Sequence, residues 1–169
     1  MKVIHIIGHP DAGKTTLTAR VITEAVHQGI KVGSIKHSAH AHELDRPGKD
    51  SFLHRKAGAS PAAMITPDLA AVYLPKEDGG TCESLLQTLY SHLDLVIVEG
   101  WISGPYDKIE IWRAALNKPP LFLSVPAVRA FVTDDTGALE AALETRAGTP
   151  PCFPGDAVRQ ITAFLINGL

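Results

Sequence analysis

The chain has 169 residues, of which 45% are hydrophobic and 20% charged, a length and composition typical of a single globular domain with a buried core. Its formal net charge of −2 and its pI of about 6.4 exclude the strongly basic surface that nucleic-acid binding requires. Its two cysteines lie far apart, which fits a reducing compartment, so we expect the protein in the cytoplasm. No run of about 20 apolar residues is present, so we expect no membrane partner. From the length and the charge we expect one domain over residues 1–169 and no nucleic-acid partner.

The first predicted element is a strand over residues 2–7, because KVIHII is a nearly continuous apolar run. A helix over residues 15–28 follows, with apolar residues at helical spacing and Gly29 at its end. IKVGSIK (30–36) predicts a second strand. Residues 37–50 show no periodicity, and such a long loop in a compact domain is usually functional or mobile.

In the middle of the chain we expect a short helix, a hairpin and a further helix. Asp50 or Ser51 is placed to cap the short helix, which runs to Ala57. The apolar stretches 62–66 and 69–74 form a hairpin around a Pro-Asp turn. Thr81 begins the further helix, whose inward residues are expected to be Leu85, Leu86, Leu89 and Tyr90.

The last part of the chain predicts four strands and a helix. DLVIVEG (94–100) is a buried strand, whereas KIEIWR (108–113) alternates and predicts a half-exposed antiparallel strand at an edge. LFLSV (121–125) and RAFVT (129–133) are further strands, and Asp156 caps the final helix. Strands alternating with helices predict an α/β fold with a mainly parallel sheet that has an antiparallel extension. Together with the phosphate-binding motif at residues 8–16, described next, this pattern predicts a three-layer fold of the P-loop NTPase type.

The stretch GHPDAGKTT (8–16) matches the phosphate-binding pattern G-x-x-x-x-G-K-[ST] between a predicted strand and a predicted helix. The two glycines let the backbone approach a phosphate, and the start of the helix offers free N–H groups. Lys14 supplies a charge for the β- and γ-phosphates. We therefore expect a nucleotide phosphate site formed by Gly8, His9, Pro10, Asp11, Ala12, Gly13, Lys14, Thr15 and Thr16.

A Mg²⁺ site is expected beside this loop. The Thr15 hydroxyl is one ligand of the pattern, and the second is a carboxylate at the end of a neighbouring buried strand. Glu99 ends the strand DLVIVE and is the candidate.

Several polar and aromatic residues allow more than one interpretation. Lys36 can contact a phosphate or pair with Asp45. Trp101 and Tyr106 can stack on a ring of a ligand or pack within their loop. Three histidines in one loop, with a fourth nearby, can hold a metal ion, face a ligand or be solvated; these are His37, His40, His42 and His54.

Three stretches together resemble the MobB family of molybdopterin-guanine dinucleotide biosynthesis adaptor proteins. They are GHPDAGKTTL, VGSIKHSAHAHELDRPGKDSFLHRKAGA and DLVIVEGW with the later KIEIWR. The resemblance implies Asp45 as a further possible metal ligand. It also implies that Asp45, Lys49 and Asp50 belong to a ligand loop facing the nucleotide or the pterin. Lys36 and His37, which lead into that loop, are further candidates for contacting the ligand.

The resemblance further implies a GTP-binding accessory protein of molybdenum cofactor biosynthesis, with Mg²⁺ and at most weak GTPase activity. Implied partners are the molybdenum cofactor guanylyltransferase, molybdopterin and a second copy of the chain. No guanine-reading N-K-x-D is present, because NKPP (117–120) fails at its last position, and Asp134 is the alternative base contact. Two other functions stay open at this point: a small-molecule kinase and a metallochaperone GTPase.

Overall fold

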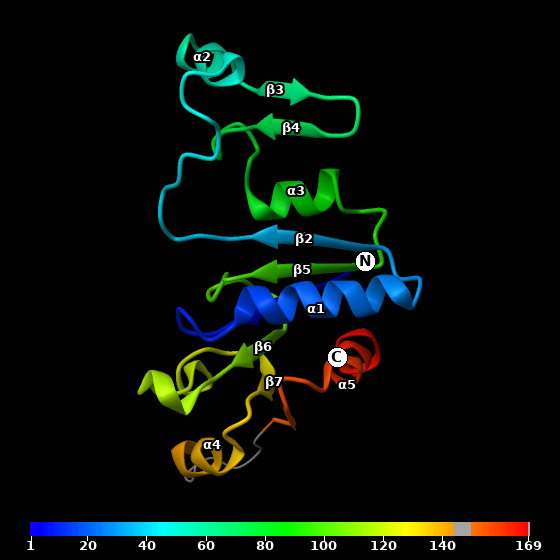
Figure 1. Ribbon diagram of the computed structural model, residues 1–169, viewed down its shortest axis with the longest axis vertical. Helices are drawn as coiled ribbons and strands as arrows, with labels where there is room; N and C mark the ends of the chain where they lie inside the picture. Colours follow the sequence, from blue (N-terminus) through cyan, green and yellow to red (C-terminus); the bar gives the residue numbers. More distant parts are fainter. Residues whose placement is uncertain (144–149, 169) are drawn as a thin grey trace. The chain divides into compact units, whose positions relative to one another are not determined.

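The computed structural model describes residues 1–143 and 150–168, which form two compact units (Figure 1). The first unit combines Met1–Ser38 with His92–Leu169, and the second consists of Ala39–Ser91. The single domain expected over residues 1–169 stays a prediction. In the described part of the chain, no helix has the length and apolar character needed to cross a membrane.

The first unit is built on a six-stranded sheet in which every pair of neighbours is parallel. The strand order is β2-β5-β1-β6-β7-β8. The central strands are runs of β-branched residues buried on both faces, as parallel strands require. The strand bounds are β1 Lys2–Ile7, β2 Val32–Lys36, β5 Leu95–Glu99, β6 Lys108–Ile111, β7 Val128–Val132 and β8 Cys152–Phe153.

Helices cover both faces of this sheet, so the predicted three-layer arrangement is confirmed. Helices α1 (Lys14–His27) and α5 (Val158–Asn167) pack together and share one core with Ala130 and Val132 of β7. Helix α4 (Thr136–Leu143) packs near Phe131, whose side chain points to the opposite face because neighbours along a strand alternate. Two 3-10 turns complete the unit, η1 (Ala114–Leu116) and η2 (Leu121–Leu123).

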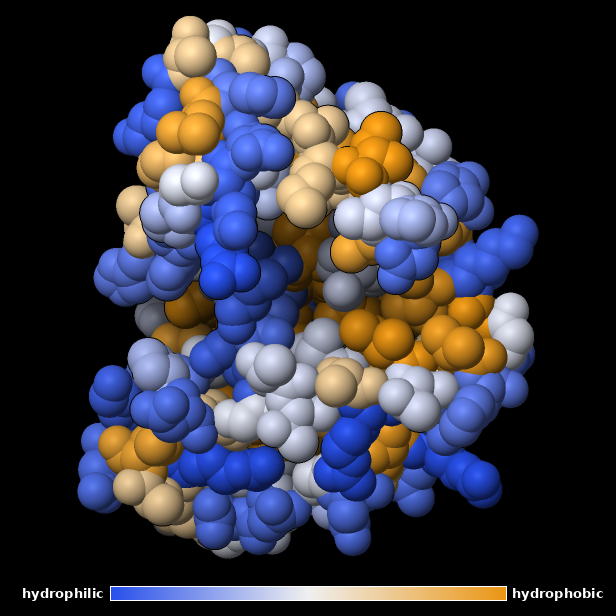
Figure 2. Space-filling model, turned by 45° about the horizontal axis from the view of Figure 1, so that its top comes forward, coloured by the Kyte–Doolittle hydropathy of each residue, from blue (hydrophilic) through white to orange (hydrophobic). Residues whose placement is uncertain are grey.

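The second unit contains α2 (Asp50–Lys56), the antiparallel hairpin of β3 (Ala62–Ile65) with β4 (Ala70–Tyr73), and α3 (Cys82–Thr88). The predicted hairpin and the start of α3 are confirmed, since the Thr81 side chain accepts a hydrogen bond from the Ser84 N–H at 3.1 Å. Hydrophobic residues appear on the surface among hydrophilic ones (Figure 2). Those exposed on the hairpin are Met64, Ile65, Leu69 and Val72.

The prediction of a half-exposed antiparallel edge strand over 108–113 is wrong. Strand β6 lies between β1 and β7, is parallel to both, and is buried at all four residues. Its two charged residues are satisfied by backbone groups of nearby loops. Lys108 Nζ donates to the carbonyls of Gly104 and Tyr106, and the Glu110 carboxylate accepts the N–H groups of Leu121 and Phe122.

Four smaller predictions are also wrong. Residues 121–123 form the turn η2 rather than a strand, because Glu110 holds the first N–H groups of that turn. Neither Asp50 nor Ser51 is the N-cap of α2, and Asp156 is not the N-cap of α5; the N-cap residues are Lys49 and Ala157. Leu89, expected to face inward, is exposed. The elements α4 and β8 were not expected from the sequence.

Candidate functional site

The phosphate-loop pattern lies between β1 and α1, in the strand–loop–helix context that its chemistry needs. Gly8 has a φ of +151°, and a Cβ at this position would lie 2.4 Å from the Ile111 carbonyl oxygen. Gly13 adopts the left-handed conformation, with a φ of +96°, directly before α1. No acidic side chain lies in the first turn of α1, so its N–H groups and dipole remain suited to an anion.

The Lys14 side chain contacts carbonyl groups of the phosphate loop itself. Lys14 Nζ donates to the carbonyls of Gly8 at 2.9 Å and His9 at 2.7 Å. Burial lowers the pKa of Lys14, and the positive charge of Lys36 lowers it further. The negative charges of Glu99 and Asp11 act in the opposite direction and raise it. Asp11 is exposed. The other loop residues are exposed Pro10 and Thr16, buried Ala12, and His9, which donates to the Pro119 carbonyl at 2.9 Å.

The two expected Mg²⁺ ligands of this unit lie in direct contact. Thr15 Oγ1 donates to Glu99 Oε1 at 2.8 Å, and Glu99 is buried at the end of β5. A hydroxyl and a carboxylate are oxygen donors of the kind that Mg²⁺ prefers. The donor set therefore fits Mg²⁺, and these two residues would hold it. Lys36 pairs with the same Glu99 oxygen.

The ends of β2 and β5 are further joined by aromatic side chains. The His37 N–H donates to the Glu99 carbonyl at 2.9 Å. The His37 ring stacks on Trp101, with 5.4 Å between centroids and 13° between planes. His5 of β1 contacts Trp101 edge-on and accepts the Tyr106 N–H at 3.3 Å. The two aromatic residues therefore pack within the loop that follows β5.

Asp134 follows β7 and lies at an open pocket of about 650 Å³. Its carboxylate accepts the Gly155 N–H at 2.8 Å and lies 3.6 Å from Arg113 Nη1. Arg20 of α1 donates to the Gly155 carbonyl at 2.9 Å, so the pocket borders the helix that starts at the phosphate loop. Sequence reasoning did not identify this pocket, although Thr133 and Pro154 directly follow the ends of β7 and β8. The residues that line the pocket together with Asp134 are Arg20, Arg113, Thr133, Thr136, Pro154, Gly155 and Asp156.

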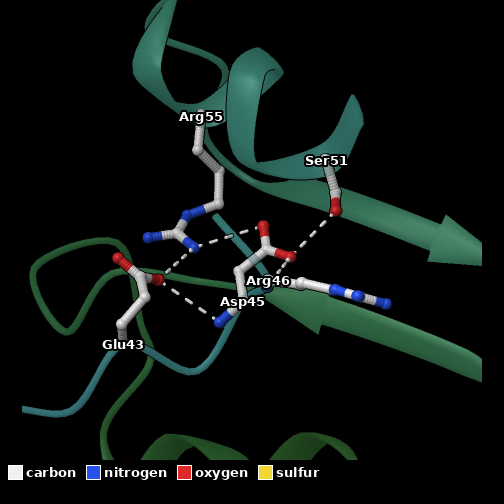
Figure 3. Close-up of polar contacts among 5 residues, drawn as sticks. All are labelled: Glu43, Asp45, Arg46, Ser51 and Arg55. Atoms are coloured by element: carbon white, nitrogen blue, oxygen red, sulfur yellow. Dashed lines mark hydrogen bonds and ion pairs between the residues drawn. The ribbon is translucent and has the colours of Figure 1, made fainter. Parts of the chain in front are cut away.

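Asp45 lies in the second unit, where its carboxylate holds the loop against α2 (Figure 3). It is buried, and Oδ1 accepts the Ser51 hydroxyl at 3.0 Å and the Arg46 N–H at 2.8 Å. Oδ2 lies 3.4 Å from Arg55 Nη1, which also pairs with Glu43 at 3.1 Å. Both oxygens of Asp45 thus have partners within this unit.

The remaining expected ligand residues belong to the same unit. Lys49 and Asp50 are exposed at the start of α2. Within residues 1–143 and 150–168, no group of three or more His, Cys, Asp and Glu side chains is placed to hold a metal ion. No described cluster therefore favours the metallochaperone alternative over the nucleotide site.

Comparisons with known proteins agree on one family. A family model described as "Molybdopterin guanine dinucleotide synthesis protein B" matches residues 3–134. A molybdopterin-guanine dinucleotide biosynthesis adapter protein of Haemophilus influenzae is 34% identical over 118 residues, which are 69% of this chain and 66% of the relative. The relative of that name in Escherichia coli is 35% identical over 111 residues, 64% of this chain and 63% of the relative. The matched region spans just under two thirds of these relatives.

A crystal structure of molybdopterin-guanine biosynthesis protein B has a TM-score of 0.71, 23% identity and 99% coverage of both chains. At that level of identity, the likeness shows a shared fold. The predicted α/β fold of the P-loop type is confirmed by this likeness together with the sheet order.

Proposed function

Because the chain belongs to the MobB family, whose model matches residues 3–134, we propose that it is a GTP-binding accessory protein that assists the conversion of molybdopterin into its guanine dinucleotide form. One observation carries the nucleotide part of the proposal. A glycine-containing loop leads from a buried strand into α1, and Thr15 of that helix contacts a buried strand-end carboxylate. These are the two halves of a metal–triphosphate site.

The residues of the first unit have distinct roles in this proposal. The backbone N–H groups of residues 8–16, except Pro10, which has none, cradle the phosphates. The backbone conformations of Gly8 and Gly13 permit this arrangement. When a nucleotide binds, Lys14 Nζ gives up its hydrogen bonds to the carbonyls of Gly8 and His9 and donates to phosphate oxygens instead. Mg²⁺, when bound, neutralises phosphate charge and fixes the orientation of the triphosphate. Thr15 and Glu99 hold it there.

Hydrolysis is expected to be slow, in keeping with an accessory role. In the described part of the chain, the cations that contact the phosphate loop and Glu99 are Lys14 and Lys36. Arg20 and Arg113 make their contacts at the pocket beside Gly155 and Asp134 instead. Without an arginine at the transferred phosphate, turnover loses about 10³–10⁵-fold.

The pocket at Asp134 is the proposed place of the base. A carboxylate can accept two N–H groups from the edge of guanine, whereas adenine offers an acceptor at the corresponding ring nitrogen. GTP should therefore bind more tightly than ATP, by about tenfold for one unmatched polar contact.

Calorimetric titration of the full chain with GTP and with ATP, each with Mg²⁺, tests this proposal. Asp134→Asn should weaken GTP binding about tenfold and leave ATP binding unchanged. Asp107→Asn, which alters a carboxylate paired with Arg129 just before β6, is the matched control. Equal loss for both nucleotides would remove Asp134 from the base site, and no binding of either nucleotide would refute the nucleotide function.

The partners belong to the same proposal. They are the guanylyltransferase that joins molybdopterin to GMP, molybdopterin itself and a second copy of the chain, in the cytoplasm. The adapter description of the relatives supports a role beside an enzyme. Co-elution of the chain with the cognate transferase, with and without Mg·GTP, checks this role; separate elution under both conditions would contradict it.

A further inference from the structure

Lys36 occupies a position that the proposed nucleotide site leaves unexplained. It ends β2, and in the sheet register it lies directly opposite Glu99, which ends β5. Its Nζ contacts Glu99 Oε1, the same oxygen that accepts the hydrogen bond from Thr15 Oγ1. An ammonium group therefore lies against the carboxylate oxygen that Thr15 shares, where a metal held by Thr15 and Glu99 would bind.

The two partners of this ion pair differ in how firmly the fold holds them. The side chain of Glu99 is 7% exposed, whereas that of Lys36 is 61% exposed. A buried carboxylate is costly unless a cation compensates it. Lys14 makes its hydrogen bonds to the carbonyls of Gly8 and His9, so the contacting charge on Glu99 comes from Lys36. An exposed lysine can leave such a pair without disturbing the core.

We propose that Lys36 is a stand-in cation: it neutralises Glu99 while no metal–nucleotide is bound, yields that carboxylate to Mg²⁺, and then contacts the terminal phosphate. The inference rests on the nucleotide site proposed above. It assigns Lys36 a positioning role that couples metal binding to phosphate binding. The phosphate contact follows from charge, because an ammonium displaced by a dication moves to the nearest anion, which is the bound nucleotide.

The proposal predicts two effects of opposite sign for Lys36→Gln. Without Mg²⁺, GTP should bind about tenfold more weakly, because the buried Glu99 carboxylate then lies beside the triphosphate with no contacting cation to compensate its charge. The concentration of Mg²⁺ that half-saturates the GTP-bound chain should fall about tenfold, because no ammonium competes for Glu99. A lysine that only supported the fold would weaken binding by the same factor in both conditions.

The experiment is calorimetric titration of the full chain with GTP, in EDTA and over a series of Mg²⁺ concentrations. Lys31→Gln is the matched control, because it removes the same charge at an exposed position just before β2. Lys36→Arg is the second variant. It retains the charge and can bind Glu99 through two N–H groups, so it should need more Mg²⁺ than the unsubstituted chain.

The inference is overturned if Lys36→Gln changes GTP affinity by one factor in EDTA and in Mg²⁺, or behaves like Lys31→Gln. It is also overturned if Lys36→Arg needs less Mg²⁺ than the unsubstituted chain. These results leave the proposed function intact. Failure of the unsubstituted chain to bind GTP in any condition would refute the proposed function and this inference together.

Discussion

His5 should make the first unit less stable in acid. It is fully buried in β1, where its ring contacts Trp101 and Tyr106. Burial lowers the pKa of His5 from 6.5 to about 4, and the charges of Lys108 and His37 act in the same direction, against a backbone contact with Val98. In the unfolded chain the same imidazole takes up a proton near its ordinary pKa.

The sign and size of the effect follow from this difference. The folded chain keeps His5 neutral, so the stability from this residue is complete above the unfolded pKa and is lost as the pH falls toward the folded one. Between pH 8 and pH 5 the loss is about 2 kcal/mol, from about 1.4 kcal/mol per pKa unit over the roughly 1.5 units below the unfolded pKa.

Urea unfolding at pH 8 and pH 5, followed by circular dichroism, measures this loss. His5→Gln cannot take up the proton, and its amide oxygen can still accept the Tyr106 N–H. The unsubstituted chain should therefore lose about 2 kcal/mol more than His5→Gln between the two pH values. His27→Gln, at the exposed end of α1, is the control. Equal losses in the unsubstituted chain and His5→Gln would refute the reasoning.

Four further substitutions test other contacts. Gly8→Ala should abolish GTP binding in calorimetry, because its Cβ would lie 2.4 Å from the Ile111 carbonyl oxygen, whereas Gly13→Ala meets no atom within 4 Å and should bind more weakly without losing binding. Burial raises the pKa of Glu110, so its contribution to stability is complete below the unfolded pKa and is lost as the pH rises through the folded one. In urea unfolding between pH 4 and pH 7, the free energy of unfolding should therefore decrease less with rising pH for Glu110→Gln than for the unsubstituted chain. The same decrease in both would contradict the prediction. Asp45→Asn removes the charge that pairs with Arg55 and should lower the free energy of the opening that exposes the amides of α2 by about 1–3 kcal/mol, so that their hydrogen exchange is faster. The amides of β6 are the control and should exchange at an unchanged rate.

The sequence was sufficient where structure depends on neighbouring residues. Strands β1 and β5 are continuous or nearly continuous apolar runs, and the phosphate-loop pattern fixes the start of α1 from nine consecutive residues, 8–16. The hairpin β3–β4 was found because its turn lies between two short apolar stretches. These signals are local, so no tertiary contact is needed to interpret them.

Sequence reasoning failed where distant groups decide the environment of a residue. Alternation in KIEI indicates exposure for Lys108 and Glu110, yet both are buried because loop carbonyls and the N–H groups of η2 satisfy them. Likewise, the pairing of Lys36 with Glu99 depends on the register of β2 against β5, across 63 positions of sequence. A single sequence contains no signal for that register.

The uniform direction of the six strands has a practical consequence for handling the protein. The loops that leave β1, β5 and β7 carry the candidate ligands, whereas residue 1, Lys31 and Asp107 precede the strands β1, β2 and β6. Met1 is 53% exposed. A fluorophore or a surface tether attached at the amino end would therefore be separated from the ligand-bearing loops by the length of the sheet, and immobilised protein would present those loops to an incoming partner.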